Sequence, residues 1–264
     1  MTEHPRSVVF DRAAAYYDRT RDVSADTRRA ATEVLVGELR GRGSILEVGV
    51  GTGLVALPLH RSGLQVVGID LSAPMLGKLL EKAGPETPFP VAQADATRLP
   101  FPDRVFGATL ASHVLHLIDP WQPAVDEMVR VTRPGGVLLI DLGGPRSSGW
   151  ASTGVTEQFW SQIPDGRRRR RLRGARPVDE EMRRRGFRVR SLPEVLGARE
   201  TTIGELIDRL EQGTQSACWE LEEGVRRQAA ARTREWALRR HGSLEVRQTL
   251  ERVIAWQAYD LPDS

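Results

Sequence analysis

A glycine-rich turn in the first third of the chain has residue types that suit a ribose-bearing ligand. Gly49, Gly51 and Gly53 follow an apolar run, and glycines let the backbone turn sharply and approach a ligand with no Cβ in the way. Their G-x-G-x-G spacing differs from the dinucleotide-binding G-x-G-x-x-G. Glu47 would repel a pyrophosphate at this turn, whereas Asp70, at the end of the next apolar run, is typical of an acceptor for ribose hydroxyls. A glycine-rich turn alone also occurs in NAD enzymes, kinases and plain loops, and these three details make the signal more specific.

Two histidines follow a later apolar run. His113 and His116 are three residues apart, so on a helical turn they share a face, and either is a candidate to contact a substrate or to act as a general base. The spacing also invites a metal interpretation, but no third ligand is evident, and we expect no metal site. His116 could instead have a purely structural role.

These residues need a sheet to position them. Five short apolar runs between residues 44 and 143 predict strands, and they alternate with helical patterns. The predicted strands are Ser44–Val48, Gln65–Asp70, Phe89–Ala94, Val105–Ala111 and Gly136–Leu142. Alternation at this pitch predicts parallel crossovers, because parallel strands need a long connection that is usually a helix.

Helix signals fill the intervals. Ala25–Leu39 has an apolar face, and Ser72 is a candidate N-cap before a proline in the first turn. Pro120–Thr132 carries apolar residues at helical spacing and ends before Pro134-Gly-Gly. We therefore predict an α/β fold: a Rossmann-like, mostly parallel seven-stranded sheet with helices on both faces.

The last third of the chain is less regular. Asp179–Arg185 reads as a helix before a strand, Ile203–His241 as helical, and Val253–Leu261 as the closing strand. The five arginines at Arg167–Arg171 read as a solvated loop or as an attractor for an anionic acceptor. We expect a single domain over 1–264, with an N-terminal helical cap (1–43), a ligand-binding core (44–143) and an acceptor-side region (144–264) that contains a helical insertion at about 202–243.

Composition is that of an ordinary globular protein. The 264 residues are 40% hydrophobic and 28% charged with a net charge of +3, which is weak support for a nucleic-acid partner. Cys218 is the single cysteine, so an internal disulfide is excluded. Neither a secretory signal in the first residues nor a membrane-spanning run is visible. These features predict a cytoplasmic protein.

Four motifs in order resemble a known family. They are Ile45-Leu-Glu-Val-Gly-Val-Gly-Thr-Gly, Asp70-Leu-Ser-Ala-Pro-Met, Ala94-Asp-Ala-Thr-Arg-Leu-Pro-Phe and Glu127-Met-Val-Arg-Val-Thr-Arg-Pro-Gly-Gly. With Phe10-Asp-Arg-Ala-Ala-Ala-Tyr-Tyr-Asp, which looks like a leading helix, they resemble class I S-adenosylmethionine-dependent methyltransferases. The likeness is to the small-molecule group similar to the ubiquinone and menaquinone C-methyltransferases.

The resemblance implies S-adenosyl-L-methionine as cofactor, with S-adenosyl-L-homocysteine as product, and a set of cofactor-binding residues. Glu47 and Gly49 would lie near the methionine portion and Gly51 below the adenosine, while Asp70 would accept both ribose hydroxyls. Leu71 and Met75 would pack on the adenine, with core packing as their alternative. The full implied set is Tyr17, Arg21, Glu47, Gly49, Gly51, Asp70, Leu71, Met75, Asp95, Ala96 and Ala111.

The acceptor is less defined. We expect a small molecule methylated at oxygen, nitrogen or carbon. A tRNA or rRNA methyltransferase and a methyltransferase-fold protein with a non-methylating reaction stay open as alternatives. Five aromatic residues could line an apolar pocket or form core: Trp150, Phe159, Trp160, Trp219 and Trp236. The helical Thr202–His241 could pack in a homodimer or form a lid.

Overall fold

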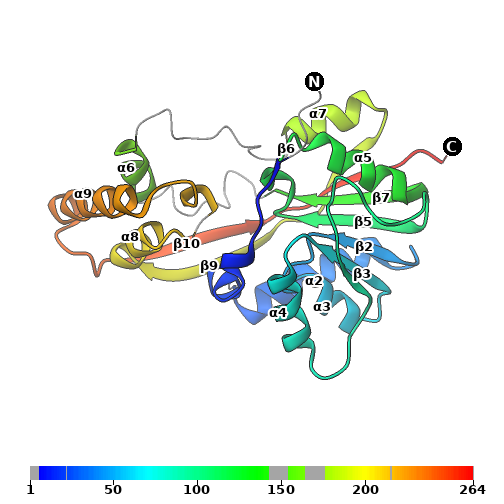
Figure 1. Ribbon diagram of the computed structural model, residues 1–264, viewed down its shortest axis with the longest axis horizontal. Coiled ribbons are helices and arrows are strands. Elements are labelled where there is room, and N and C mark those ends of the chain that lie inside the picture. The colour runs from blue at the N-terminus through cyan, green and yellow to red at the C-terminus, as the bar shows by residue number, and fades with distance from the viewer. Residues whose placement is uncertain (1–5, 22, 143–153, 164–175, 215, 264) are drawn as a thin grey trace. The chain divides into compact units, whose positions relative to one another are not determined.

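Seven strands form the central sheet in the order β4-β3-β2-β5-β7-β11-β8 (Figure 1). The computed structural model describes residues 6–21, 23–142, 154–163, 176–214 and 216–263. Strand β11 runs antiparallel to both of its neighbours, and the pairs from β4 to β7 are parallel. The predicted mostly parallel, Rossmann-like sheet is therefore confirmed.

The chain divides into two compact units. The first comprises 1–144, 171–195 and 254–264, and the second comprises 145–170 and 196–253. The sheet belongs to the first unit. Its strands are β2 (Ile45–Val48), β3 (Val66–Asp70), β4 (Val91–Gln93), β5 (Phe106–Ser112), β7 (Thr132–Asp141), β8 (Arg188–Ser191) and β11 (Gln257–Asp260).

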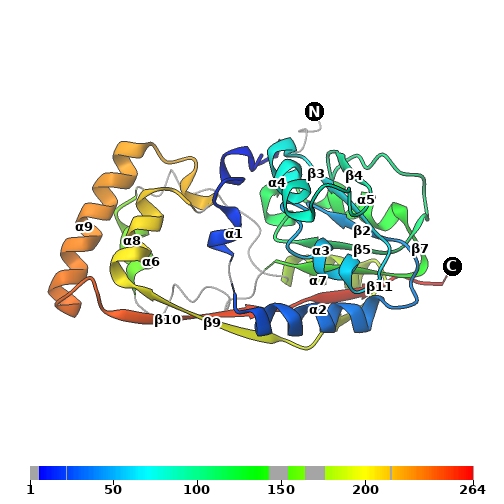
Figure 2. The same cartoon turned by 90° about the horizontal axis from the view of Figure 1, so that it is seen from below.

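Helices cover both faces of this sheet. Its helices are α2 (Ala25–Leu39), α3 (Ala56–Arg61), α4 (Ala73–Ala83), α5 (Gln122–Val131) and α7 (Arg176–Arg184). Figure 1 shows α2, α3 and α4 below the sheet and α5 and α7 above it, and Figure 2 views the first three from below.

Side chains that point alternately to the two faces of the sheet form two apolar clusters, one on each face. On β2, Ile45 packs with α2 to α4, while Leu46 and Val48 pack with α5 and α7. On β7, Leu139 belongs to the first cluster and Leu138 to the second, because successive side chains of a strand point to opposite faces. All four residues of β2 are buried, as expected for the middle of a parallel sheet.

The N-terminal segment is held along the carboxyl edge of the sheet. Strand β1 (Arg6–Ser7) pairs antiparallel with β6 (Ile118–Asp119). After it come the 3₁₀ turn η1 (Asp11–Ala13) and the short helix α1 (Tyr17–Thr20). The structure thus has two short turns where the resemblance implied one leading helix.

Side chains fix these turns to the core. Ser72 Oγ donates to Asp11 Oδ1 at 2.6 Å, and Thr52 Oγ1 donates to Asp18. Lys82 Nζ donates to the other oxygen of Asp18 at 2.8 Å. We call residues 6–21 the N-terminal strap.

The second unit has its own core and more strand than the sequence indicated. It contains α6 (Val155–Ser161), α8 (Ile203–Glu211), the 3₁₀ turn η4 (Ser216–Cys218) and α9 (Glu223–His241), so the helical insertion is present. It also contains most of a two-stranded sheet of β9 (Val195–Thr202) and β10 (Arg247–Ile254). Helix α8 begins with a capping box between Thr202 and Glu205, which satisfies otherwise unpaired N–H groups.

Three aromatic residues of this unit belong to its core. Phe159 is fully buried, and Trp160 and Trp236 pack against the same apolar cluster. The indole of Trp219 donates to the Gly213 carbonyl at 2.8 Å. Trp150 and the run Arg167–Arg171 lie outside the described residues.

In the described part of the chain, no helix combines the length and the apolar character that crossing a membrane requires.

Candidate active site

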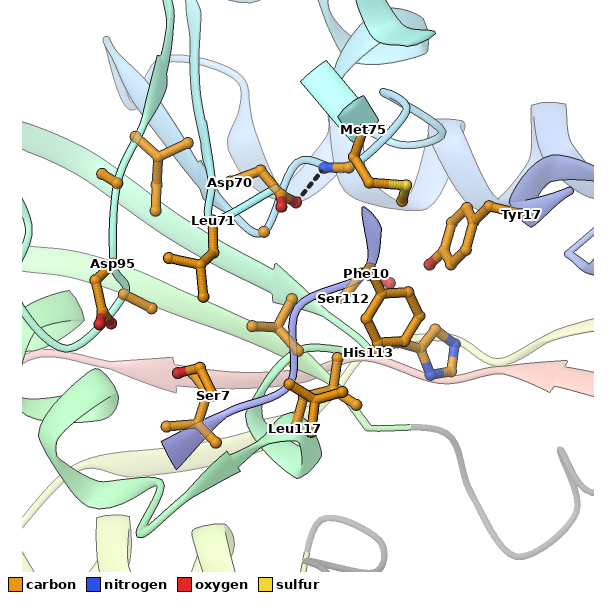
Figure 3. Close-up of a pocket in the computed structure, with 18 residues that line it drawn as sticks. Ser7, Phe10, Tyr17, Asp70, Leu71, Met75, Asp95, Ser112, His113 and Leu117 are labelled. Atoms are coloured by element: carbon orange, nitrogen blue, oxygen red, sulfur yellow. Dashed lines mark hydrogen bonds between the residues drawn. The ribbon is translucent and has the colours of Figure 1, made fainter. Parts of the chain in front are cut away.

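A pocket opens at the carboxyl ends of β2, β3, β4 and β5, where a parallel sheet of this topology places its ligands. It holds about 630 Å³ of empty space, part of it open to solvent. Figure 3 shows Asp70, Leu71 and Asp95 on one side and Phe10, Tyr17 and His113 on the other. All of its lining residues belong to the first unit: Ser7, Val8, Phe10, Tyr17, Gly49, Gly51, Ile69, Asp70, Leu71, Met75, Ala94, Asp95, Ala96, Ser112, His113, Val114, Leu117 and Ile118.

The glycine turn gives the pocket its floor. Gly49 has φ of 72°, and a Cβ there would lie 2.1 Å from Val114 Cγ2. Gly51 has φ of 55°, and a Cβ there would lie 3.3 Å from Met75 Cε and 3.9 Å from Asp70 Oδ2. Both positions need glycine, because φ is positive and an added Cβ would intrude between pocket-lining side chains.

Asp70 is held rigidly at the end of β3. Its Oδ2 accepts from the Gly51 N–H at 2.8 Å, drawn as the dashed line in Figure 3, and its Oδ1 accepts from the Ser72 N–H at 2.8 Å. Burial raises the pKa of Asp70 above its ordinary value, although the N–H groups of Ser72 and Gly51 act in the opposite direction. A fixed, partly desolvated carboxyl group is well suited to accept from two hydroxyls.

Glu47 is buried one strand away. It is 2% exposed and is not among the residues that line the pocket. Burial raises its pKa well above the ordinary value; an N–H bond from Ala56 opposes this rise and the nearby charge of Asp70 adds to it. Within the described residues its Oε2 has no hydrogen-bond partner. A buried acid with an unsatisfied oxygen is expected to attract a cationic ligand.

The wall on the Asp70 side of the pocket suits an aromatic base. Leu71 and the buried Met75 supply apolar surface, and Ala96 lies beside Asp95. Thr97 donates to Asp95 Oδ1 through its N–H at 2.8 Å and its hydroxyl at 2.9 Å. Among the described residues both bonds reach the same oxygen, so Oδ2 is the one placed to accept from an amino group of a ligand.

The strap supplies the remaining wall. Phe10 and Tyr17 lie edge to face with ring centroids 6.0 Å apart, and both line the pocket. Arg21 lies outside the lining and places its guanidinium 5.5 Å from the Tyr17 ring centroid. Ser7, Val8 and Phe10 were not among the predicted cofactor residues. Of these three residues, only Phe10 could have been found from the sequence, because it is the first residue of the N-terminal motif.

The two histidines separate at the end of β5. His113 lines the pocket with φ of 54°, so it lies in a left-handed turn and not in the helical turn that the spacing suggested. His116 lies in the 3₁₀ turn η2 (Leu115–Leu117), outside the lining, with its ring centroid 6.3 Å from that of His113. Ala111 is also outside the lining and is 1% exposed on β5. Of the two candidates, His113 is the one that the pocket contains.

This arrangement fits S-adenosylmethionine. Gly51 leaves space for a nucleoside between Met75 and Asp70, and Asp70 suits a ribose diol. The unsatisfied oxygen of Glu47 suits a cation, and this ligand carries both a sulfonium and an ammonium group. These are observations of fit, and the individual roles stay predictions.

Comparisons with known proteins agree. Residues 46–140 match the family described as methyltransferase domain. The chain is 36% identical over 162 residues to demethylmenaquinone methyltransferase of Renibacterium salmoninarum, which covers 60% of this chain and 67% of that protein. It is 38% identical over 129 residues to phosphatidylethanolamine N-methyltransferase of Cereibacter sphaeroides, which covers 48% of this chain and 62% of that protein.

Solved structures share the fold. The YcgJ protein of Bacillus subtilis superposes with a TM-score of 0.59 at 17% identity, covering 88% of this chain and 99% of that one. With the matched motifs, the strand order and the relatives in agreement, the chain belongs to the family of class I S-adenosylmethionine-dependent methyltransferases.

Proposed function

We propose that this enzyme methylates a small molecule that approaches the cofactor from the His113 side of the pocket. The observation that carries this proposal is the shared pocket. Asp70 and Asp95 lie at one side as acceptors for a nucleoside, and His113 and Tyr17 lie at the other as polar groups for a second molecule. Both sets line the same pocket, so two ligands could meet there.

S-adenosylmethionine, when bound, supplies a methyl group already activated on a sulfonium. The residues of the chain then need to hold, orient and shield the reactants. Asp70 and Asp95 would fix the nucleoside, and Phe10 and Tyr17 would exclude water. His113 would take a proton from an acceptor that has one to lose.

The relatives support a small acceptor. Their names specify demethylmenaquinone in one case and N-methylation of phosphatidylethanolamine in the other. We infer an acceptor of that size for this enzyme, without a choice among oxygen, nitrogen and carbon. An RNA acceptor depended on Arg167–Arg171, which lies outside the described residues. A homodimer, a cytoplasmic location and an acceptor-side role for residues 144–264 stay predictions from the sequence.

The first test is a calorimetric titration of Asp70→Ala with S-adenosylmethionine and S-adenosylhomocysteine. Removal of the carboxyl group should weaken both ligands by about 10²-fold, because two charge-assisted hydrogen bonds are lost at about 1.5 kcal/mol each. Asp26→Ala is the matched control, since this exposed side chain pairs only with Arg29 in the described structure. Unchanged affinity in Asp70→Ala would overturn the assigned ribose site.

Methyl release should then be measured against phenols, a naphthoquinol, amines, carboxylates and bulk tRNA. Turnover on one small-molecule class supports the proposal and names the acceptor atom. Turnover on tRNA that falls steeply with salt would replace it with the RNA alternative. Tight cofactor binding without any turnover would favour a non-methylating reaction.

A further inference from the structure

A buried acid lies beside His113 and has no part in the cofactor site described above. Asp141 ends β7, and its side chain is 4% exposed. His113 Nε2 lies 3.5 Å from Asp141 Oδ2, and Ser112 Oγ donates to the same oxygen at 3.4 Å. A desolvated carboxylate is costly unless it is paired, so these contacts require an explanation.

The fold fixes this pair firmly. Ser112 and Asp141 are direct partners in the parallel ladder between β5 and β7. The His113 N–H then donates to the Asp141 carbonyl at 2.7 Å, which extends the ladder by one bond. The left-handed φ of 54° at His113 follows immediately, and strain of this kind persists where the surroundings over-determine it. Backbone pairing therefore sets the position of the imidazole relative to the carboxylate.

The contact also selects one tautomer of the ring. His113 Nε2 lies on the Asp141 side of the ring, and a carboxylate accepts a hydrogen bond and cannot donate one, so a bond formed between them requires the hydrogen on Nε2. Nδ1 then holds the lone pair, and it belongs to a ring that lines the pocket. An orienting carboxylate behind a histidine is the arrangement by which enzymes hold a general base in the required tautomer.

We propose that Asp141 is the positioning residue of His113, and that the acceptor atom methylated by this enzyme carries a proton, as the oxygen of a phenol or alcohol does. This inference rests on the proposed function. In the step, an acceptor lone pair forms the new bond to the methyl carbon while the old bond to sulfur breaks with its electron pair left on sulfur. The acceptor proton passes to His113 Nδ1 and afterwards to solvent. Asp141 stays ionised and stabilises the imidazolium.

The other titratable groups near this pair do not alter the assignment. In the described structure His116 stacks edge to face with His113, and Tyr17 lines the same pocket. Glu47 lies on the neighbouring strand β2, beside β5. Of the two acids, Glu47 and Asp141, the structure places Asp141 within ion-pair distance of the His113 ring.

The test is ¹⁵N NMR of the histidine side chains in the full-length protein without ligands. His113→Asn identifies the His113 signals and retains a residue that tolerates positive φ. In the wild type, we expect only the Nε2–H tautomer at pH values above the titration. In Asp141→Asn, we expect a mixture of tautomers and a titration midpoint moved to lower pH, because the charge that stabilises the imidazolium is lost. Ser112→Ala is the matched control and should keep the single tautomer.

Two NMR results would overturn the inference: an Nδ1–H tautomer in the wild type, or unchanged tautomer and midpoint in Asp141→Asn. Once an acceptor is known, His113→Asn should lower kcat by about 10²-fold or more, and Asp141→Asn should move the acid limb of the pH profile to lower pH. Calorimetry with S-adenosylmethionine separates the two proposals. If the wild type does not bind S-adenosylmethionine, the proposed function is wrong. If it binds S-adenosylmethionine but His113 is the Nδ1–H tautomer, only the role proposed for Asp141 is wrong.

Discussion

Glu47 shows how one buried acid can couple cofactor binding to protons. Burial raises its pKa well above the ordinary value, so over the pH range between the two values it retains a proton that an exposed glutamate would have lost. A cation bound beside Glu47 favours the ionised carboxylate and so lowers its pKa. We therefore expect S-adenosylmethionine binding to release a proton between the ordinary glutamate pKa and the raised one, and affinity to increase with pH over that window.

Calorimetry in buffers of different ionisation enthalpy measures the released proton directly. Glu47→Gln should abolish the buffer dependence, and Glu33→Gln, a surface change on α2, should leave it intact. If Glu47→Gln releases as many protons on binding as the wild type does, the released proton comes from a group other than Glu47.

The same shift has a consequence for stability. A carboxyl group with a raised folded-state pKa contributes stability that is complete below the unfolded-state pKa and is lost as pH rises through the folded-state pKa. Glu47→Gln should therefore gain free energy of unfolding relative to wild type as pH rises from the ordinary glutamate pKa toward the raised folded-state pKa. Urea denaturation at several pH values measures this difference, and a constant difference would contradict the assigned cause.

At the scale of elements, a single substitution can weaken the contacts between the N-terminal strap and the core of the first unit. Asp18 joins α1 to Thr52 and Lys82, and its side chain is 41% exposed. Such a contact is worth about 1 kcal/mol after allowance for solvent screening. Asp18→Ala should therefore raise the dissociation rate of S-adenosylhomocysteine about fivefold, because the strap lines the pocket through Phe10 and Tyr17.

Stopped-flow displacement measures this rate, with Asp26→Ala as the control on α2. An unchanged dissociation rate, with the variant still folded, would mean that strap opening does not limit ligand release.

The elements also show where sequence reasoning succeeds and fails. Short apolar runs located all five parallel strands of the sheet, among them the fully buried β2. Strand β10 was missed because its sequence, Arg-Gln-Thr-Leu-Glu-Arg-Val-Ile, is largely polar in a two-stranded sheet. The left-handed turn at His113 had no local signal, since it is imposed by pairing with Asp141 across β5 and β7.

The pocket was predictable to the extent that its residues lie in motifs. Asp70, Gly51 and Asp95 were found because chain order places them at strand ends on one edge. Ser7 in the pocket and Asp141 behind His113 were not found, since their positions come from β1 pairing with β6 and from β5 pairing with β7. Contacts between segments far apart in sequence carry little trace in either segment alone.

At the scale of the whole molecule, one arginine ties three segments of the first unit together. Arg190 on β8 donates to Glu38 on α2 at 2.8 and 3.1 Å and to Asp260 on β11 twice at 2.7 Å. The guanidinium lowers the pKa of both carboxyl groups below their ordinary values. A lowered folded-state pKa contributes stability that is present above the unfolded-state pKa and is lost as pH falls through the folded-state pKa.

Arg190→Met should lower the free energy of unfolding by about 1–2 kcal/mol at pH 7, with allowance for the partial exposure of the network. The difference from wild type should begin to shrink below about pH 4, where the carboxyl groups of the unfolded state take up protons, and should continue to shrink as pH falls through the lowered folded-state values. Denaturant titrations at pH 7 and pH 3.5 check this expectation. Arg29→Met removes an exposed pair and should change little; a pH-independent loss in Arg190→Met would indicate lost packing alone.

The chain leaves the sheet at the end of β8 and returns to it at the start of β11, at neighbouring positions of one ladder. Ser191 pairs with Gln257, and the Leu192 N–H donates to the Trp256 carbonyl at 2.9 Å, so the 63 or so residues between them leave and rejoin the sheet at neighbouring positions. The entropy of closing such a loop grows only with the logarithm of its length. Insertions, deletions or wholesale replacement within it would leave the sheet ladder unbroken. The chain is thus built so that descendants can diversify this segment while inheriting an unaltered cofactor pocket.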